Sequence, residues 1–110
     1  LRGHDEADVL RIGAAIESQS NHPLALAIVA EAERRGLAKD VVAGAASISG
    51  KGAEARIDGT VYWAGSERLV KEKGFDDALY RVEFDAFESK GMTAVIVGDG
   101  AGPIGIVALA

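Results

Sequence analysis

A chain of 110 residues with 48% apolar and 26% charged side chains has the size and composition of one globular domain. The net charge of −5 argues against binding nucleic acid through a basic surface, and the absence of cysteine excludes disulfides and thiolate metal sites. No apolar run reaches the roughly 18 residues that span a bilayer, so we expect no direct membrane contact. Because the chain starts without Met and stops within an apolar run, we expect residues 1–110 to be one domain excised from a longer protein.

The first third of the chain predicts two helices, over residues 6–18 and 22–35. Apolar residues recur at helical spacing, namely Val9, Ile12 and Ile16 in the first helix and Leu24, Ala25, Ile28, Val29 and Ala32 in the second. Pro23 falls in a first turn, where its missing N–H costs nothing, and Gly36 marks a helix end.

The middle of the chain predicts strands. The first covers residues 41–49, and two more, over 53–57 and 60–64, flank Asp58-Gly59. This dipeptide is typical of the two-residue turn in a β-hairpin.

The last part predicts two helices and a second pair of strands. A short helix over 66–73 begins at Ser66, which is a suitable N-cap, and a longer one covers 76–90. We expect four apolar residues of the longer helix to point inward: Leu79, Val82, Ala86 and Phe87. Strands over 93–97 and 104–109 follow. Since hairpins dominate the order ααβββααββ, we predict an α+β fold with an antiparallel β-sheet flanked by helices.

The loop between the first two helices brings together two polar groups of complementary type. Glu17 ends one helix and His22 begins the next, where the positive end of the helix dipole favours a neutral imidazole. Such a ring can stack on a purine, and a nearby carboxylate can accept a hydrogen bond from an adenine amino group. The alternative is that both residues only cap and solvate a loop.

A second stretch, Gly50-Lys51-Gly52, lets the backbone turn sharply and present N–H groups close to a phosphate. The alternative is a simple bend between strands. The run from Gly44 to Gly52 resembles a Walker A loop, but its first glycine comes one residue early and Gly52 replaces the required Ser or Thr. We expect no catalytic residue and no metal site in the chain.

Taken together, these stretches resemble the nucleotide-binding (N) domain of heavy-metal-transporting, CPx-type P-type ATPases. In that family a Glu lies five residues before a His-Pro pair, and a Gly-x-Gly follows about thirty residues later. Glu17, His22-Pro23 and Gly50-Lys51-Gly52 match this order, and Gly65-Ser66 stands where the family usually has Gly-Asn. The resemblance covers essentially the whole chain, including the closing stretch 91–97.

The resemblance implies that Glu17 and His22 recognise adenine, that Gly50 and Gly52 line the pocket beside the phosphate or ribose, and that Gly65 and Ser66 complete the site. The ligand would be ATP or ADP, as Mg-ATP in the parent protein. The implied partners are the phosphorylation and actuator domains of the same chain, in the cytoplasmic part of a membrane-embedded transporter. The stretch 20–24, Ser-Asn-His-Pro-Leu, is more similar to zinc, cadmium, lead or cobalt exporters than to copper exporters.

Two features limit what the domain does alone. The Asp-Lys-Thr-Gly-Thr motif, whose Asp the family phosphorylates, is absent, so we expect the isolated chain to be inactive as an ATPase. Gly98-Asp99-Gly100 matches only the start of the family's magnesium motif, and we interpret it as a turn. Two alternatives stay open: a cap domain of a haloacid-dehalogenase-like phosphatase, and a non-catalytic interaction module.

Overall fold

The structure is a computed structural model that describes residues 6–18, 23–37, 42–48, 52–75 and 80–109. Within these ranges, nine elements follow one another in the predicted order. They are α1 (Glu6–Glu17), α2 (Pro23–Arg34), β1 (Val42–Ile48), β2 (Gly52–Ile57), β3 (Thr60–Gly65), α3 (Glu67–Glu72), α4 (Arg81–Ser89), β4 (Thr93–Asp99) and β5 (Gly102–Leu109). Among the described residues, no helix combines the length and the apolar character needed to cross a membrane.

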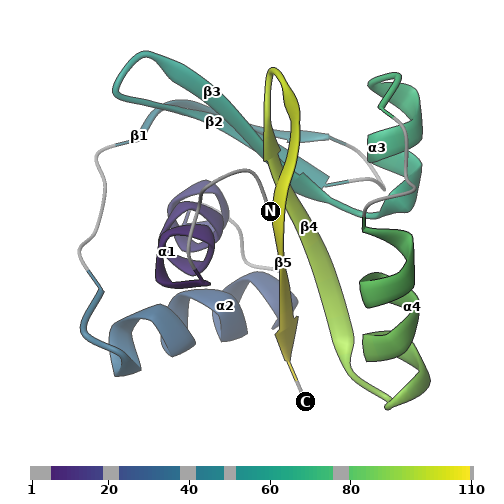
Figure 1. The fold of residues 1–110 in the computed structure, drawn as a ribbon. Helices are drawn as coiled ribbons and strands as arrows, with labels where there is room; N and C mark the ends of the chain where they lie inside the picture. The colour runs from purple at the N-terminus through teal and green to yellow at the C-terminus, as the bar shows by residue number, and fades with distance from the viewer. Residues whose placement is uncertain (1–5, 19–22, 38–41, 49–51, 76–79, 110) are drawn as a thin grey trace.

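The five strands form one antiparallel sheet in the order β1-β2-β3-β4-β5. Helices α1 and α2 cover one face of this sheet, and α3 and α4 cover the other (Figure 1). The prediction of an antiparallel sheet flanked by helices is therefore confirmed. The hairpin turn is also confirmed, because Asp58 and Gly59 both have positive φ, at 50° and 80°.

A separate apolar core fills each side of the sheet. The side under α1 and α2 contains the predicted stripe residues Val9, Ile12, Ile16 and Ile28, packed on Val97 and Ile104 among others. The side under α3 and α4 contains Trp63, Leu69, Val70, Tyr80, Phe84 and Ile96. Strand residues alternate between the two cores, as the pleat of a β-strand requires.

Helix α4 differs from its prediction in where it begins and in which face it buries. The helix begins at Arg81, later than the predicted residue 76, and residues 76–79 with Leu79 lie outside the described part. Val82 is 76% exposed and Ala86 is also exposed, so the prediction that both point inward is wrong. Tyr80 and Phe84 are buried instead, because two aromatic rings one helical turn apart bury more apolar area than a valine and an alanine.

Candidate functional site

Gly52 and Gly65 face each other across the β2–β3 ladder at one end of the sheet. Gly52 is the first residue of β2, with φ of +154°, and a Cβ placed on it would lie 2.1 Å from the carbonyl oxygen of Ala64. The same Cβ would lie 2.7 Å from the Cα of Gly65. Gly52 is therefore required for the close approach of the two strands, which is a structural reason for glycine at this position.

Ser66 directly follows this glycine pair and is the N-cap residue of α3. Its carbonyl oxygen accepts hydrogen bonds from the N–H groups of Leu69 and Val70, at 3.1 and 3.3 Å. The predicted position is confirmed, but the hydroxyl makes no capping hydrogen bond. The exposed hydroxyl can therefore donate to or accept from a ligand.

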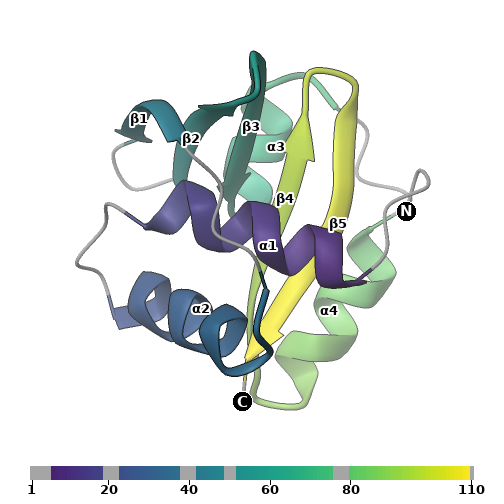
Figure 2. The same ribbon diagram turned by 90° about the vertical axis from the view of Figure 1, so that its left-hand side faces the viewer.

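Glu17 is the last residue of α1 and is half-buried. The helix crosses the sheet from β5, where Val9 lies against Gly105, so its C-terminal end lies on the β1–β2 side (Figure 2). A carboxylate at a helix C-terminus opposes the helix dipole, which prefers cations there. The helix dipole therefore does not account for an acidic residue at this position.

The structure brings Gly52, Gly65 and Ser66 together and places Glu17 on the same half of the sheet. His22 and Gly50 lie outside the described residues, so their convergence with this group stays a prediction. Gly98 and Asp99 end β4, and the turn before β5 is closed by a 2.9 Å hydrogen bond from the N–H of Ala101 to Oδ1 of Asp99. Of the predicted turn Gly98-Asp99-Gly100, only Gly100 lies in the turn, because β4 continues two residues further than predicted. No group of three or more potential metal ligands occurs in the described part of the chain.

Nothing in the sequence singles out Trp63 as a site residue. It is 1% exposed, two positions before Gly65 on β3, and its indole Nε1 donates a 2.9 Å hydrogen bond to the carbonyl oxygen of Asp99. A Cβ on Gly98 would fall 2.1 Å from the indole ring, so the ring occupies the space that this glycine leaves open. In the sequence, Trp63 is a single tryptophan in a predicted strand, and such a residue is equally typical of an ordinary hydrophobic core.

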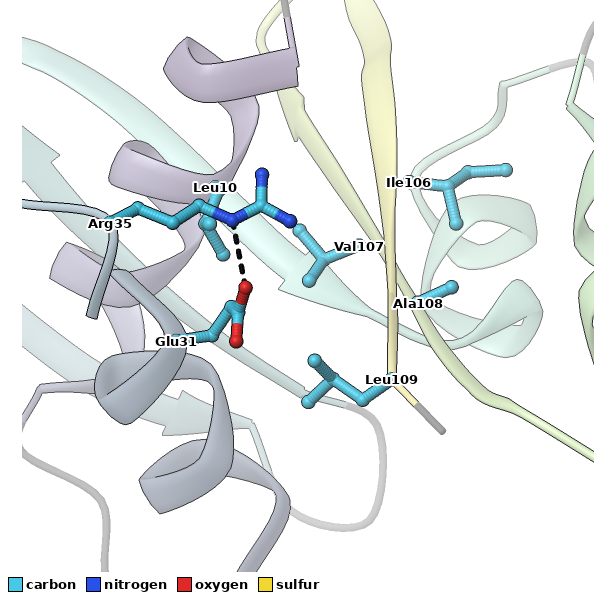
Figure 3. Close-up of a pocket in the computed structure, with 7 residues that line it drawn as sticks. All are labelled: Leu10, Glu31, Arg35, Ile106, Val107, Ala108 and Leu109. Carbon is cyan, nitrogen blue, oxygen red and sulfur yellow. Dashed lines mark hydrogen bonds and ion pairs between the residues drawn. The ribbon is translucent and has the colours of Figure 1, made fainter. Parts of the chain in front are cut away.

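A separate cavity of about 240 Å³ lies between the two N-terminal helices and β5. Val107 and Leu109 point to the same side of β5 as Glu31 and Arg35, whereas Ile106 and Ala108 point away from it (Figure 3). Glu31 accepts hydrogen bonds from Arg34, at 3.0 Å, and from Arg35, at 2.7 Å.

These hydrogen bonds, with that from Arg34 the larger influence, lower the pKa of Glu31 below its ordinary value. The carboxylate in turn raises the pKa of Arg34. The guanidinium of Arg35, which lines this cavity, therefore already has a carboxylate partner, and the lining side chains other than Glu31 and Arg35 are apolar. Such a surface is poorly suited to a polyphosphate, which needs donors that are not already neutralised.

Similar proteins were found at the level of sequence and of structure. A probable cadmium-transporting ATPase from Staphylococcus aureus is 38% identical over 96% of this chain, and a probable copper-exporting P-type ATPase V from Mycobacterium tuberculosis is 38% identical over 93%. No protein-family model matches the chain. The crystal structure of the N-domain of HMA8, a copper-transporting P-type ATPase, matches with a TM-score of 0.83 at 33% identity. That match covers 98% of this chain and 92% of the HMA8 domain.

The chain belongs to the N-domain family of heavy-metal-transporting P-type ATPases. A zinc-transporting PIB-type ATPase in its E2.Pi state contains the same fold, with a TM-score of 0.85 at 32% identity over 99% of this chain. The N-domain described here spans only 13% to 15% of the length of the curated relatives named above.

Proposed function

We propose that this chain binds the adenine nucleotide of Mg-ATP and presents it for phosphorylation of an Asp in a neighbouring domain of a heavy-metal-exporting P-type ATPase. The observation that carries the proposal is the match to an isolated N-domain over nearly the full length of both chains. In phosphoryl transfer the protein contributes mainly positioning and charge stabilisation. This domain would supply the positioning of the nucleotide, and the acceptor Asp would come from the phosphorylation domain.

Each proposed site residue has a distinct task. Glu17 accepts a hydrogen bond from the adenine amino group, and His22 stacks its neutral ring on the purine. Gly50 and Gly52 line the phosphate or ribose side with backbone rather than side chain, and Gly65 with Ser66 extends that wall. Support for this assignment comes from the glycine pair and Ser66, which adjoin at one end of the sheet, and from the half-buried carboxylate at the end of α1.

The affinity should be low. The net charge of −5 gives phosphates no long-range attraction, and one stacking contact with a few hydrogen bonds corresponds to about 4–6 kcal/mol, or high micromolar to millimolar dissociation constants. Calorimetric titration of the isolated chain should therefore give similar weak binding of ATP and ADP, and weaker binding of GTP. Nanomolar affinity, or GTP binding equal to that of ATP, would contradict adenine recognition. Absence of any nucleotide binding would favour a non-catalytic interaction module.

We further propose that the parent transporter exports zinc, cadmium, lead or cobalt rather than copper. Support comes from Asn21 in the stretch 20–24, where copper exporters often carry Glu. The relatives named above include both cadmium and copper transporters, so overall identity does not discriminate between them. The test is metal-stimulated ATPase activity of the full-length transporter in membranes. Stimulation by Cu⁺ and not by Zn²⁺ or Cd²⁺ would contradict this assignment.

A further inference from the structure

The sheet has a narrow seam between β3 and β4. Only three residue pairs join these strands, namely Trp63–Gly98, Ala64–Val97 and Gly65–Ile96. The β2–β3 and β4–β5 ladders on either side are longer. This seam connects the β1–β2–β3 meander to the β4–β5 hairpin, and Gly65 is both a member of the seam and the cross-strand partner of Gly52.

The indole of Trp63 extends this seam beyond its three backbone pairs. The 2.9 Å hydrogen bond from Nε1 reaches the carbonyl oxygen of Asp99, one residue past Gly98, which is the last residue of β4 that pairs with β3. The ring fills the space over Gly98, where any Cβ would overlap it. On the other side of β4, the register of the β4–β5 ladder shifts between Val97 and Gly98. The contact of the indole with Gly98 and Asp99 therefore holds β4 to β3 beside this irregularity.

Two residues that follow α3 also lie against the indole. Phe75 stacks on the ring with centroids 6.0 Å apart and an angle of 14° between the ring planes. The ammonium of Lys73 lies 5.9 Å from the ring centroid and 3.4 Å from a carboxylate oxygen of Glu54, the cross-strand partner of Trp63. The end of β4 and the residues after α3 thus meet at one side chain, and Lys73 links it to Glu54 of β2.

We propose that Trp63 is a positioning residue for the nucleotide site, an inference that rests on the proposed function. By fixing the seam, the indole holds Gly65, and through it Gly52 and Ser66, in one arrangement. When the seam relaxes, a smaller fraction of molecules has the arrangement that binds nucleotide, and the apparent dissociation constant rises by the inverse of that fraction. Trp63 acts through the backbone of its neighbours and does not touch the ligand.

Trp63→Phe tests this role because it keeps an aromatic ring and removes the N–H donor. We expect the dissociation constant for ATP, per folded molecule, to rise measurably and by no more than about 10-fold, because the loss of one buried hydrogen bond shifts the equilibrium of the seam by at most about that factor. The matched control is Phe84→Leu, which changes an aromatic residue of the same apolar core on α4. The control should lower the free energy of unfolding and leave the affinity for ATP unchanged.

The wild-type chain is titrated with ATP first, so that a failure of the proposed function can be told apart from a failure of the positioning role of Trp63. No ATP binding by the wild-type chain would refute the proposed function. Wild-type binding with an unchanged dissociation constant in Trp63→Phe would overturn the positioning role alone. An equal loss of affinity in Phe84→Leu would also overturn it, because general destabilisation would then explain both variants.

A measurement on the wild-type chain keeps the proposal testable if Trp63→Phe does not fold. The chain has one tryptophan, so its indole N–H gives a single, unambiguous resonance in a nitrogen–proton spectrum. We expect this resonance to shift during an ATP titration in parallel with the amides of Gly65 and Ser66. An indole resonance that stays fixed while those amides move would show that the seam does not respond to the site.

Discussion

Substituting alanine for Gly52 is the sharpest test of the site geometry. The new methyl group would lie 2.1 Å from the carbonyl oxygen of Ala64 and 2.7 Å from the Cα of Gly65. Both are backbone atoms of the neighbouring strand, so no rotation of a side chain relieves the overlap. The φ of +154° adds strain, because L-residues rarely adopt this backbone conformation.

The loss of unfolding free energy expected for Gly52→Ala has two parts of similar size. Overpacking in a well-packed region costs about 1–3 kcal/mol, and a residue held in a sparsely populated backbone region costs about 1–3 kcal/mol. Their sum, about 2–6 kcal/mol, is a large share of the 5–15 kcal/mol typical of a whole domain. Gly59→Ala is the matched control, since Gly59 also has a positive φ, of +80°, but no atom lies within 4 Å of its Cβ position. It should cost only the left-handed backbone term of about 1–2 kcal/mol.

Urea unfolding of the wild-type chain and both variants gives the loss of unfolding free energy in each variant. Calorimetric titration gives the affinity of each folded variant for ATP. We expect Gly52→Ala to lose more stability than Gly59→Ala and to weaken ATP binding as well, because the β2–β3 contact must open at the glycine pair. If Gly52→Ala costs no more than Gly59→Ala, the strands do not approach closely at this point and the reasoning is wrong.

Three further predictions concern the site, the activity and the pH dependence. His22→Ala should weaken ATP binding about 5- to 150-fold, the value of one lost stacking contact, with little change in melting temperature. The effect of Glu17→Ala should be non-additive with that of His22→Ala, because both residues act on adenine. A large drop in melting temperature with unchanged affinity for ATP would show that His22 is a structural residue. The isolated chain should release no phosphate from ATP in a coupled assay, and release that survives purification and is abolished by a point substitution in this chain would refute this. Because hydrogen bonds from Arg34 and Arg35 lower the pKa of Glu31, the charged carboxylate stabilises the fold at neutral pH and this contribution is lost as the pH falls below the ordinary value of 4.5. Glu31→Gln should therefore flatten the acid side of a plot of unfolding free energy against pH, and an unchanged curve would show that the arginine pairs contribute nothing.

Local sequence signals predicted most of the fold because they act over short distances. The Asp58-Gly59 turn needs two positive φ angles, and this dipeptide supplies them at low cost. The face of α1 was found because Val9, Ile12 and Ile16 repeat at helical spacing over two turns. In α4 the same reasoning failed, since apolar residues lie on more than one face and the choice between Val82 and Phe84 depends on the core that the sheet provides.

The site was only partly predictable for the same reason. The turn chemistry of Gly52 is visible in the sequence, but its need to approach Ala64 and Gly65 arises from strand pairing. The contact of Trp63 with Gly98 and Asp99 joins residues more than thirty positions apart, and no local sequence pattern predicts such a contact.

The central claim is that adenine nucleotide binds at the end of the sheet marked by the glycine pair. Mapping amide resonances during an ATP titration tests it most directly, since the structure offers a second location for comparison. We predict that the amides of Glu17, Gly52, Gly65 and Ser66 shift and that those of Val107 and Leu109, beside the cavity of Figure 3, do not. Shifts confined to the cavity, with the amides of the glycine pair unmoved at saturating ATP, would contradict the account.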